Sequence, residues 1–180
     1  MAIIIEGPDN SGKTTLANRL SDKLKMPIFH AGGPPGSNEL AERFCDKQYQ
    51  LSKNPVILDR ITPISRQVYE NRFQEPSLMD WLVKFIEKPR NIVVYCRPPN
   101  ENLMDFSTHE IKEHDTDDHI AYITENQQNF IELYDRIMVI IPCVIYNWAN
   151  EDISFDNFAE QLYFTQIIDY YKTKLTGRFR

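Results

Sequence analysis

The residues best suited to chemistry stand in one turn near the start of the chain. Gly7, Gly12, Lys13 and Thr14 follow the Walker A spacing G-x-x-x-x-G-K-[ST]. In this pattern the glycines let backbone N–H groups converge on phosphate oxygens, the lysine reaches the β- and γ-phosphates, and the hydroxyl binds Mg²⁺. The turn therefore predicts a nucleoside triphosphate site. The expected nucleotide contacts are Gly7, Asn10, Ser11, Gly12, Lys13, Thr14 and Thr15.

The segments on either side of this turn match the structural context that the pattern requires. Ala2–Glu6 is a short β-branched run typical of a buried strand, and Thr14–Lys25 contains many helix-forming residues. The first turn of that helix would add its positive dipole end to the attraction for phosphate. The alternative is a glycine-containing turn with an incidental lysine, and the flanking segments argue against it.

A second polar cluster follows the apolar run Val56–Asp59. Asp59 ends this run and Arg60 comes directly after it. In a parallel sheet such strand ends lie at the ligand-binding edge, where a carboxylate can organise Mg²⁺ and an arginine fork suits a phosphate group. The alternative is an ordinary strand-end aspartate beside an outward-facing arginine.

Strand-like and helix-like segments alternate along the rest of the chain. The expected strands are Ala2–Glu6, Pro27–His30, Val56–Asp59, Asn91–Cys96 and Cys143–Trp148. The expected helices are Thr14–Lys25, Ser37–Ser52, Ser65–Phe73, Leu78–Glu87, Asp118–Met138 and Asp156–Lys174. This order predicts an α/β fold of three layers, in which helices cover both faces of a five-stranded parallel sheet.

Length and composition are those of an ordinary globular protein. The 180 residues fit a single domain, 1–180, with a lid-like and irregular segment at about 98–125. The net charge of −6 argues against bulk nucleic-acid binding, and no apolar run reaches membrane-spanning length. There is no basic–apolar leader, and the three cysteines form no paired framework. We therefore expect a soluble cytoplasmic protein with reduced thiols.

The two polar clusters together resemble the thymidylate kinase group of nucleoside monophosphate kinases, above all its compact phage-encoded members. The resemblance covers about residues 1–100 and rests on Glu6–Thr15, on Leu58-Asp59-Arg60 with Ser65 and Tyr69 downstream, and on Tyr95–Pro99. It implies a P-loop kinase fold and transfer of the γ-phosphoryl group of MgATP to a deoxynucleoside monophosphate, either dTMP or a modified pyrimidine relative. A phage-encoded member would act in the host cytoplasm, as a monomer or a homodimer.

The resemblance also implies roles for individual residues. Asp9 would meet the sugar 3′-hydroxyl of the acceptor, Arg60 would hold the acceptor phosphate, and Asp59 would serve the metal together with Thr14. The further acceptor-site residues would be Phe44, Lys47, Arg66 and Tyr69. For Phe44 and Tyr69, plain core packing is the alternative.

The chain departs from this family where a catalytic arginine is expected. The family carries this arginine in the phosphate-binding turn or in the lid, but Asn10 occupies the first position and residues 108–119 contain five acids, one lysine and no arginine. Charge on the transferring phosphoryl group would then be balanced by Lys13, by Mg²⁺ and by one or more of Arg60, Arg66 and Arg97. Arg97 is the new candidate because it directly follows a buried strand, and a surface arginine is the alternative.

Three hypotheses for the function stay open. The first is a deoxynucleoside monophosphate kinase; the second is a kinase that phosphorylates a hydroxyl of a nucleoside or of a modified base in DNA; the third is a P-loop nucleotide-binding protein without catalysis. The base is also open, because Asp46, Lys47 and Gln48 carry hydrogen-bonding groups for several bases. The histidines and acids of 108–119 miss the spacing of a zinc-peptidase motif and are interpreted as a solvated acidic loop.

Overall fold

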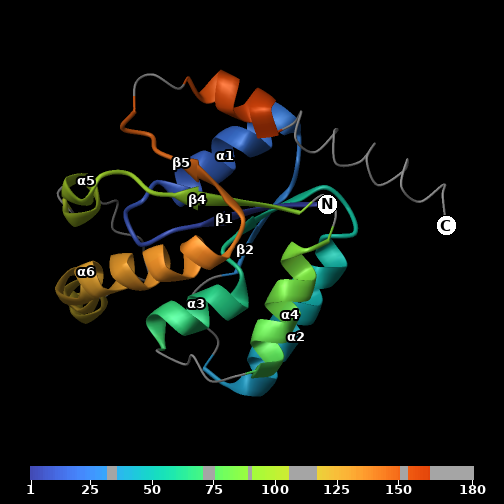
Figure 1. Cartoon of the computed structure of the whole chain (residues 1–180), viewed down its shortest axis with the longest axis horizontal. Helices are drawn as coiled ribbons and strands as arrows, with labels where there is room; N and C mark the ends of the chain where they lie inside the picture. Colours follow the sequence, from blue (N-terminus) through green and yellow to red (C-terminus); the bar gives the residue numbers. More distant parts are fainter. Residues whose placement is uncertain (32–35, 71–75, 89–90, 106–116, 151–153, 163–180) are drawn as a thin grey trace.

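Five strands form a parallel sheet in the computed structural model, which describes residues 1–31, 36–70, 76–88, 91–105, 117–150 and 154–162. The strands are β1 (Ala2–Glu6), β2 (Ile28–His30), β3 (Val56–Asp59), β4 (Ile92–Cys96) and β5 (Cys143–Tyr146). Their spatial order is β2-β3-β1-β4-β5, and all neighbours pair in parallel (Figure 1). The predicted α/β fold with a five-stranded parallel sheet is confirmed.

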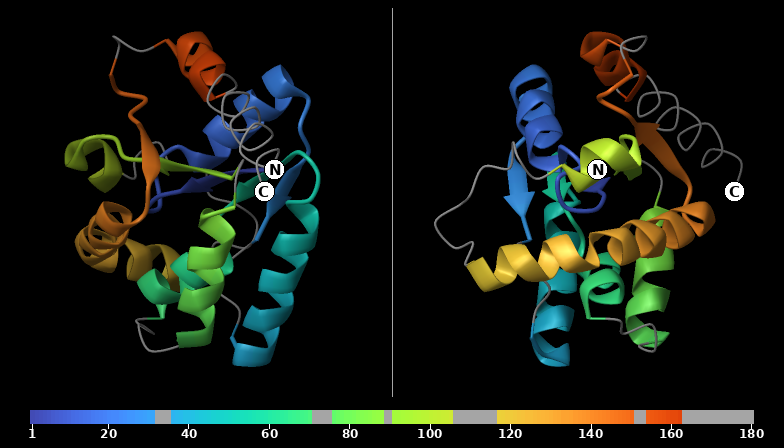
Figure 2. Two further views of the ribbon diagram at one scale, coloured as in Figure 1. Left: turned by 45° about the vertical axis from the view of Figure 1, so that its right-hand side comes forward. Right: turned by 90° about the vertical axis from the view of Figure 1, so that its left-hand side faces the viewer.

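Helices cover both faces of this sheet. They are α1 (Lys13–Leu24), α2 (Asn38–Leu51), α3 (Thr62–Tyr69), α4 (Pro76–Ile86), α5 (Asn100–Met104) and α6 (Asp117–Ile140), and a further helix spans 155–162. Figures 1 and 2 show α1 and the helix at 155–162 on one face, with α2, α3, α4 and α6 on the other. The three-layer arrangement therefore matches the prediction.

Some helix boundaries differ from those expected. The helix α3 begins at Thr62 rather than Ser65, because Pro63 suits the first turn of a helix, where its missing N–H costs no hydrogen bond. The helix α5 occupies part of the segment expected to be irregular, and α6 begins within it. The rest of that lid-like segment, 106–116, and the predicted helix beyond Leu162 lie outside the described residues, as does most of the acidic stretch 108–119.

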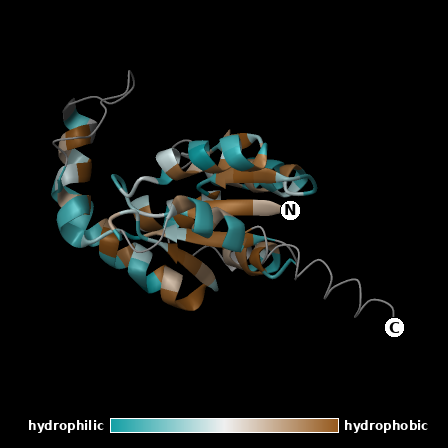
Figure 3. Ribbon diagram, turned by 90° about the horizontal axis from the view of Figure 1, so that it is seen from above, coloured by the Kyte–Doolittle hydropathy of each residue, from teal (hydrophilic) through white to brown (hydrophobic). Residues whose placement is uncertain are grey.

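The strands are apolar on both sides because both sides are covered. Successive residues of β1 point to opposite faces: Ile3 and Ile5 pack on the α1 side, and Ile4 packs on the α3 and α6 side. In Figure 3 the strands lie in the hydrophobic centre of the molecule, and hydrophilic positions lie mainly on the helices. No helix of the described segments combines the length and apolar character needed to cross a bilayer.

The long helix α6 is held to the sheet by one stripe of buried side chains. Ile123, Phe130, Tyr134 and Ile137 recur at the three- and four-residue spacing of one helix face, and all are buried. Full burial of one such side chain contributes about 1.5–3 kcal/mol. Because Tyr134 reaches the carboxyl end of β1, this stripe also brings α6 to the edge of the sheet where polar side chains collect.

Candidate functional site

The turn between β1 and α1 has the backbone that a phosphate-binding loop requires. Gly7 has a φ of 151°, and a Cβ there would lie 2.6 Å from the backbone oxygen of Cys96. Gly12 also lies in the left-handed region, with a φ of 80°, and directly precedes α1. Only glycine tolerates both the conformation and the close approach at position 7. The strand, turn and helix around the Walker A residues are thus present as predicted.

Lys13 is curled into this turn. Its Nζ donates to the carbonyl of Pro8 at 2.5 Å and to Ser11 Oγ at 3.4 Å, and its side chain is buried. Burial lowers the pKa of Lys13 to about 8, and the nearby Arg60 guanidinium acts in the same direction. An anion in the turn would oppose both effects, so the site gains electrostatic stability when it holds a negatively charged ligand.

Thr14, His30 and Asp59, which we call the Asp59 cluster, meet on the α1 side of the sheet edge. Thr14 Oγ1 lies 3.2 Å from Asp59 Oδ2, and His30 Nδ1 lies 2.9 Å from the same oxygen. No three His, Cys, Asp or Glu side chains among the described residues form a ready-made metal site. The oxygens of Thr14 and Asp59 are nevertheless the hard donors that Mg²⁺ takes alongside phosphate and water.

His30 is a residue that the sequence analysis did not single out. It ends β2, and its Cα is paired with that of Asp59 on the neighbouring parallel strand β3. Directly paired residues of adjacent strands present their side chains on the same face. The sequence did contain a signal for His30, because it is a polar residue at the end of a predicted strand, and such residues are expected at the ligand-binding edge of a parallel sheet.

Asp9, Arg60 and Tyr69, which we call the Asp9 cluster, lie together at the same edge of the sheet. Arg60 Nη2 donates to Asp9 Oδ1 at 2.5 Å, the Tyr69 hydroxyl donates to Asp9 Oδ2 at 2.8 Å, and the Arg60 guanidinium lies 4.8 Å from the centre of the Tyr69 ring. Burial alone would raise the pKa of Asp9, but Arg60, Lys13 and the Tyr69 hydroxyl together lower it to about 2. The carboxylate is therefore ionised at neutral pH.

The Arg60 backbone adopts a strained conformation that its surroundings hold in place. Its φ is 70°, which is uncommon for a residue other than glycine. The Arg60 N–H donates to the Ile5 carbonyl at 3.0 Å, and the Gln48 side-chain amide donates to the Arg60 carbonyl at 3.2 Å. Gln48 also accepts from the Thr62 N–H. Strain maintained by the surroundings is a frequent property of functional positions.

Gln48 therefore has a different role from the one considered from sequence. Its side chain is buried, and both ends of its amide are bonded to the backbone on either side of Ile61. An interpretation of Gln48 as a base-reading residue would require breaking these bonds. The sequence carries no local signal for this contact, because it joins the middle of α2 to the turn after β3.

Glu6 lies at the end of β1 in a fully buried position. Its Oε1 accepts from the Ile61 N–H at 2.6 Å, and its Oε2 accepts from the Tyr134 hydroxyl at 3.3 Å. Burial raises the pKa of Glu6 from 4.5 to about 7, although the Ile61 N–H, Arg60 and Lys13 oppose this shift. The folded protein thus favours the protonated form of Glu6 between these two pH values.

We predict that the change Glu6→Gln alters the pH dependence of stability. Because the folded-state pKa is raised, the stabilisation from protonating Glu6 is fully present below about 4.5 and is lost as pH rises through about 7. The free energy of unfolding of the natural protein should therefore fall relative to that of the variant by on the order of 3 kcal/mol between pH 4.5 and pH 8. Urea unfolding of both proteins at several pH values measures this difference. If the free energies of unfolding of the two proteins changed in parallel with pH, the raised pKa assigned to buried Glu6 would be wrong.

Two further arginines that the sequence suggested are engaged by other side chains. The Arg97 Nε and Nη2 donate to the two oxygens of Asp135 at 2.8 and 3.0 Å, and its Nη1 donates to the Pro98 carbonyl. Arg66 is buried and bonds to Glu70 and Asn38, each at 3.0 Å. Arg97 could reach a phosphate only by leaving a bidentate ion pair.

Phe44 and Lys47 lie on α2, away from the bonds that join the Asp9 cluster. Phe44 is half-buried, and Lys47 Nζ lies 4.6 Å from the centre of the Phe29 ring. Among the described residues, Lys47 forms no hydrogen bond or ion pair with Asp9 or Arg60. Their predicted contact with a base stays a prediction.

Other contacts fix the turn to the elements around it. The Asn10 side-chain amide donates to the carbonyls of Asn102 and Asp105 at the end of α5, and Gln127 of α6 donates to the Asp9 carbonyl at 2.8 Å. The Trp148 indole N–H donates to the Ser11 carbonyl at 3.1 Å. Thr15 is exposed at the first turn of α1. None of these partners could be predicted from the turn's own sequence, because they lie in distant segments that follow β4 and β5.

Trp148 also limits the space over the turn. A Cβ added at Gly12 would lie 3.0 Å from Trp148 Cδ1, so the indole packs directly on this glycine. The Trp148 residue as a whole is 44% exposed. The loop after β5 therefore covers one side of the turn while leaving an aromatic surface accessible to a ligand.

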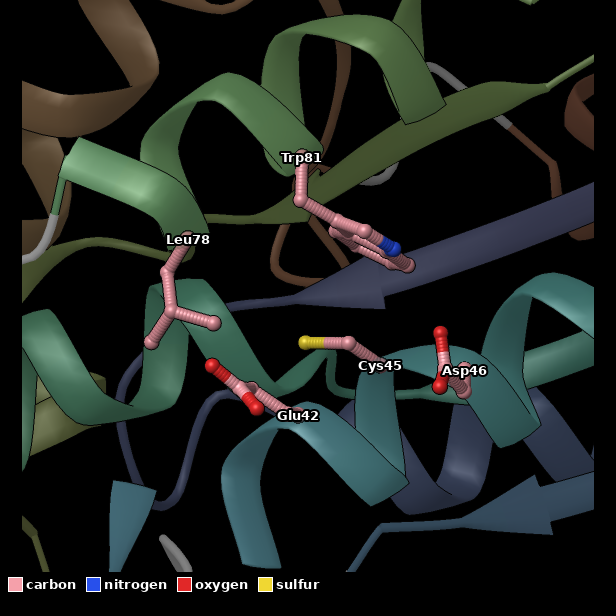
Figure 4. A pocket seen from close by; sticks show the side chains of 5 residues that line it. All are labelled: Glu42, Cys45, Asp46, Leu78 and Trp81. Carbon is pink, nitrogen blue, oxygen red and sulfur yellow. The ribbon is translucent and has the colours of Figure 1, made fainter. Parts of the chain in front are cut away.

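A separate pocket lies between α2 and α4, with a volume of about 190 Å³. Figure 4 shows its lining side chains, which are Glu42, Cys45, Asp46, Leu78 and Trp81. The lining includes no residue of the turn, the Asp9 cluster or the Asp59 cluster. This pocket is therefore separate from the candidate site.

The chain has the P-loop kinase fold, with the strand order 2-3-1-4-5 and the Walker A turn between β1 and α1. No family model matches the chain. By sequence it is 29% identical, over 175 residues, to YorR, an uncharacterized protein derived from the SPbeta prophage of Bacillus subtilis strain 168. That match covers 90% of this chain and 96% of YorR.

Solved structures show the same fold. The crystal structure of YorR from Bacillus subtilis in complex with phosphorylated GDP has a TM-score of 0.65 and 25% identity, and covers 95% of this chain and 98% of YorR. Shikimate kinase from Acinetobacter baumannii in complex with shikimate has a TM-score of 0.55 and 15% identity, and covers 95% of this chain and 94% of its own. The second likeness concerns the fold alone.

Proposed function

We propose that the chain is an ATP- and Mg²⁺-dependent phosphotransferase that converts a deoxynucleoside monophosphate to its diphosphate. The observation that carries the proposal is that the Walker A turn, the Asp59 cluster and the Asp9 cluster lie at the same edge of the sheet. The first two suit a triphosphate and its cation, and the third suits a phosphorylated sugar.

The donor half would be the turn with Lys13, Thr14 and Asp59. Backbone N–H groups of the turn would surround the phosphates, and Lys13 Nζ would move from the Pro8 carbonyl to a phosphate oxygen. Thr14 and Asp59 fit the cation because their oxygens lie 3.2 Å apart and both are hard donors. When bound, the cation would neutralise charge on the transferring phosphoryl group.

The acceptor half would be the Asp9 cluster. Arg60 uses Nη2 for Asp9, and within the described part of the chain its Nε and Nη1 donate to no protein acceptor. The N–H groups on Nε and Nη1 can therefore donate to the acceptor phosphate. Each oxygen of the ionised Asp9 carboxylate can accept a second hydrogen bond, which the sugar hydroxyl would donate.

In this mechanism the chain works by positioning and electrostatics. Asp9 would orient the sugar, and Arg60 would hold the acceptor phosphate in line with the triphosphate. Lys13 would stabilise charge as it develops on the bridging oxygen. No covalent intermediate with the protein is needed. Because Arg97 is bound to Asp135, Lys13 and Arg60 would provide most of the cationic charge from the chain itself.

The likeness to YorR supports nucleotide binding and widens the acceptors to be considered. YorR binds phosphorylated GDP, and a guanine nucleotide is a purine, whereas the resemblance noted from sequence favours dTMP or a modified pyrimidine. The acceptor base is therefore to be tested over both classes. A hydroxyl of a nucleoside or of a base in DNA is the alternative acceptor, and binding without transfer is the second alternative.

A coupled assay of ADP release tests the proposal. The natural protein is supplied with MgATP and, separately, with each deoxynucleoside monophosphate, with GMP, with the nucleosides and with single-stranded DNA. We expect ADP release that depends on a monophosphate acceptor and yields a diphosphate. Release only with nucleosides or DNA would favour the hydroxyl kinase, and ATP binding without release would favour the non-catalytic alternative.

A further inference from the structure

The Asp59 cluster brings an imidazole to the place where the cation of the proposed function would be held. Three elements contribute: His30 ends β2, Asp59 ends β3, and Thr14 lies in the first turn of α1. His30 and Asp59 are directly paired on adjacent parallel strands. Their juxtaposition therefore follows from the backbone register of the sheet and does not depend on a long flexible side chain.

The spacing of the donor atoms suits ligands of one ion. His30 Nδ1 lies 2.9 Å and Thr14 Oγ1 lies 3.2 Å from the same Asp59 oxygen, Oδ2. Two neighbouring ligands of an octahedral ion, each about 2.1 Å from it at right angles, lie roughly 3 Å apart. A hydrogen bond between His30 and Asp59 would have a similar length. The distance alone therefore does not separate a hydrogen-bonded pair from two ligands of one ion, whereas a comparison of binding by different cations does.

The cluster is also accessible. The His30 side chain is 53% exposed, whereas that of Asp59 is 9% exposed. A cation that arrives from solvent would therefore meet the imidazole at the rim and the carboxylate below it. Neutral imidazole is a good ligand for transition metals such as Co²⁺, whereas Mg²⁺ prefers oxygen ligands and water.

We propose that His30 is a third protein ligand of this cation site, and that the site consequently prefers divalent transition-metal ions to Mg²⁺. The proposal rests on the proposed function for the role of the ion. The new elements are a nitrogen ligand, His30, and the metal preference that follows from it, because Thr14 and Asp59 supply only oxygen ligands.

The test measures metal binding directly, with no nucleotide and no turnover. Co²⁺ and Mg²⁺ are titrated into untagged protein by calorimetry, and the visible absorption of bound Co²⁺ reports nitrogen ligation. The background protein carries H109N, H114N and H119N, so that His30 is its one remaining histidine. His30→Asn and His30→Gln are then compared with this background, after thermal melts have shown that each variant is folded.

We expect His30→Asn and His30→Gln to weaken Co²⁺ binding at least tenfold, to change Mg²⁺ binding by less than about threefold, and to shift the Co²⁺ spectrum. Equal losses for both ions would show that His30 only orients Asp59, and would overturn the proposal. Unchanged Co²⁺ binding, or no Co²⁺ binding in the background protein, would overturn it as well. The metal titration does not measure phosphoryl transfer. A negative ADP-release assay would therefore refute the proposed function, but it would not decide whether His30 is a metal ligand.

Discussion

Replacement of Lys13 with alanine is expected to lower turnover about a hundredfold or more, by analogy with the loss of one preorganised donor at a site of developing charge. Lys13 is the buried cation of the Walker A turn, and its Nζ already lies within hydrogen-bonding distance of Pro8 and Ser11. Alanine removes this charge from the phosphates and leaves no other lysine in the turn to replace it. The coupled ADP-release assay at saturating MgATP measures the loss.

Lys23→Ala is the matched control for this variant. Lys23 lies on the same helix, α1, but is exposed and forms an ion pair with Asp156 on the protein surface. Its removal should leave turnover within about twofold of the natural value, because Lys23 lies in the last turn of α1, away from the Walker A turn, and an exposed ion pair contributes little to stability. Natural turnover in the Lys13→Ala protein would rule out the assigned donor site.

Arg60→Lys is expected to lower kcat/KM for a monophosphate acceptor by roughly tenfold to 150-fold. Lysine keeps the positive charge beside Asp9 but loses the planar fork, and a hydrogen bond to a charged group is worth about 1.5–3 kcal/mol. The backbone strain at this position is common to both residues, because φ is 70° and neither is glycine. Stability should therefore change less than acceptor use.

Arg43→Lys serves as the control for this second variant, since Arg43 is an exposed residue of α2 paired with Glu39. The comparison also separates the functional hypotheses. If Arg60 holds an acceptor phosphate, the loss should fall on kcat/KM for the monophosphate and not on the affinity for MgATP. An equal loss with a nucleoside acceptor would contradict the role given to Arg60.

The sequence allowed the fold and half of the site to be predicted because local patterns encode them. Continuous β-branched runs indicated the strands, and the spacing from Gly7 to Thr14 indicated the turn. Asp59 ends a buried strand and Arg60 directly follows it, and parallel sheets place such strand ends at one edge. These inferences use neighbours in sequence and one general rule of topology.

The partners that hold the site could not be predicted because they come from distant segments. Gln48 reaches the Arg60 backbone from the middle of α2, and Asp135 engages Arg97 from α6, 38 residues further along the chain. Such contacts depend on how helices pack on the sheet. His30 is the exception, since strand register alone brings it to Asp59.

The most direct measurement is a crystal structure of the protein with a non-hydrolysable ATP analogue and the deoxynucleoside monophosphate that is most active in the assay. We predict that the triphosphate lies in the turn with Lys13 Nζ on a phosphate oxygen, that the Arg60 fork holds the monophosphate, and that Asp9 accepts from the sugar hydroxyl. A structure in which Asp9 and Arg60 point away from a shared ligand, or in which the triphosphate lies outside the turn, would contradict the account.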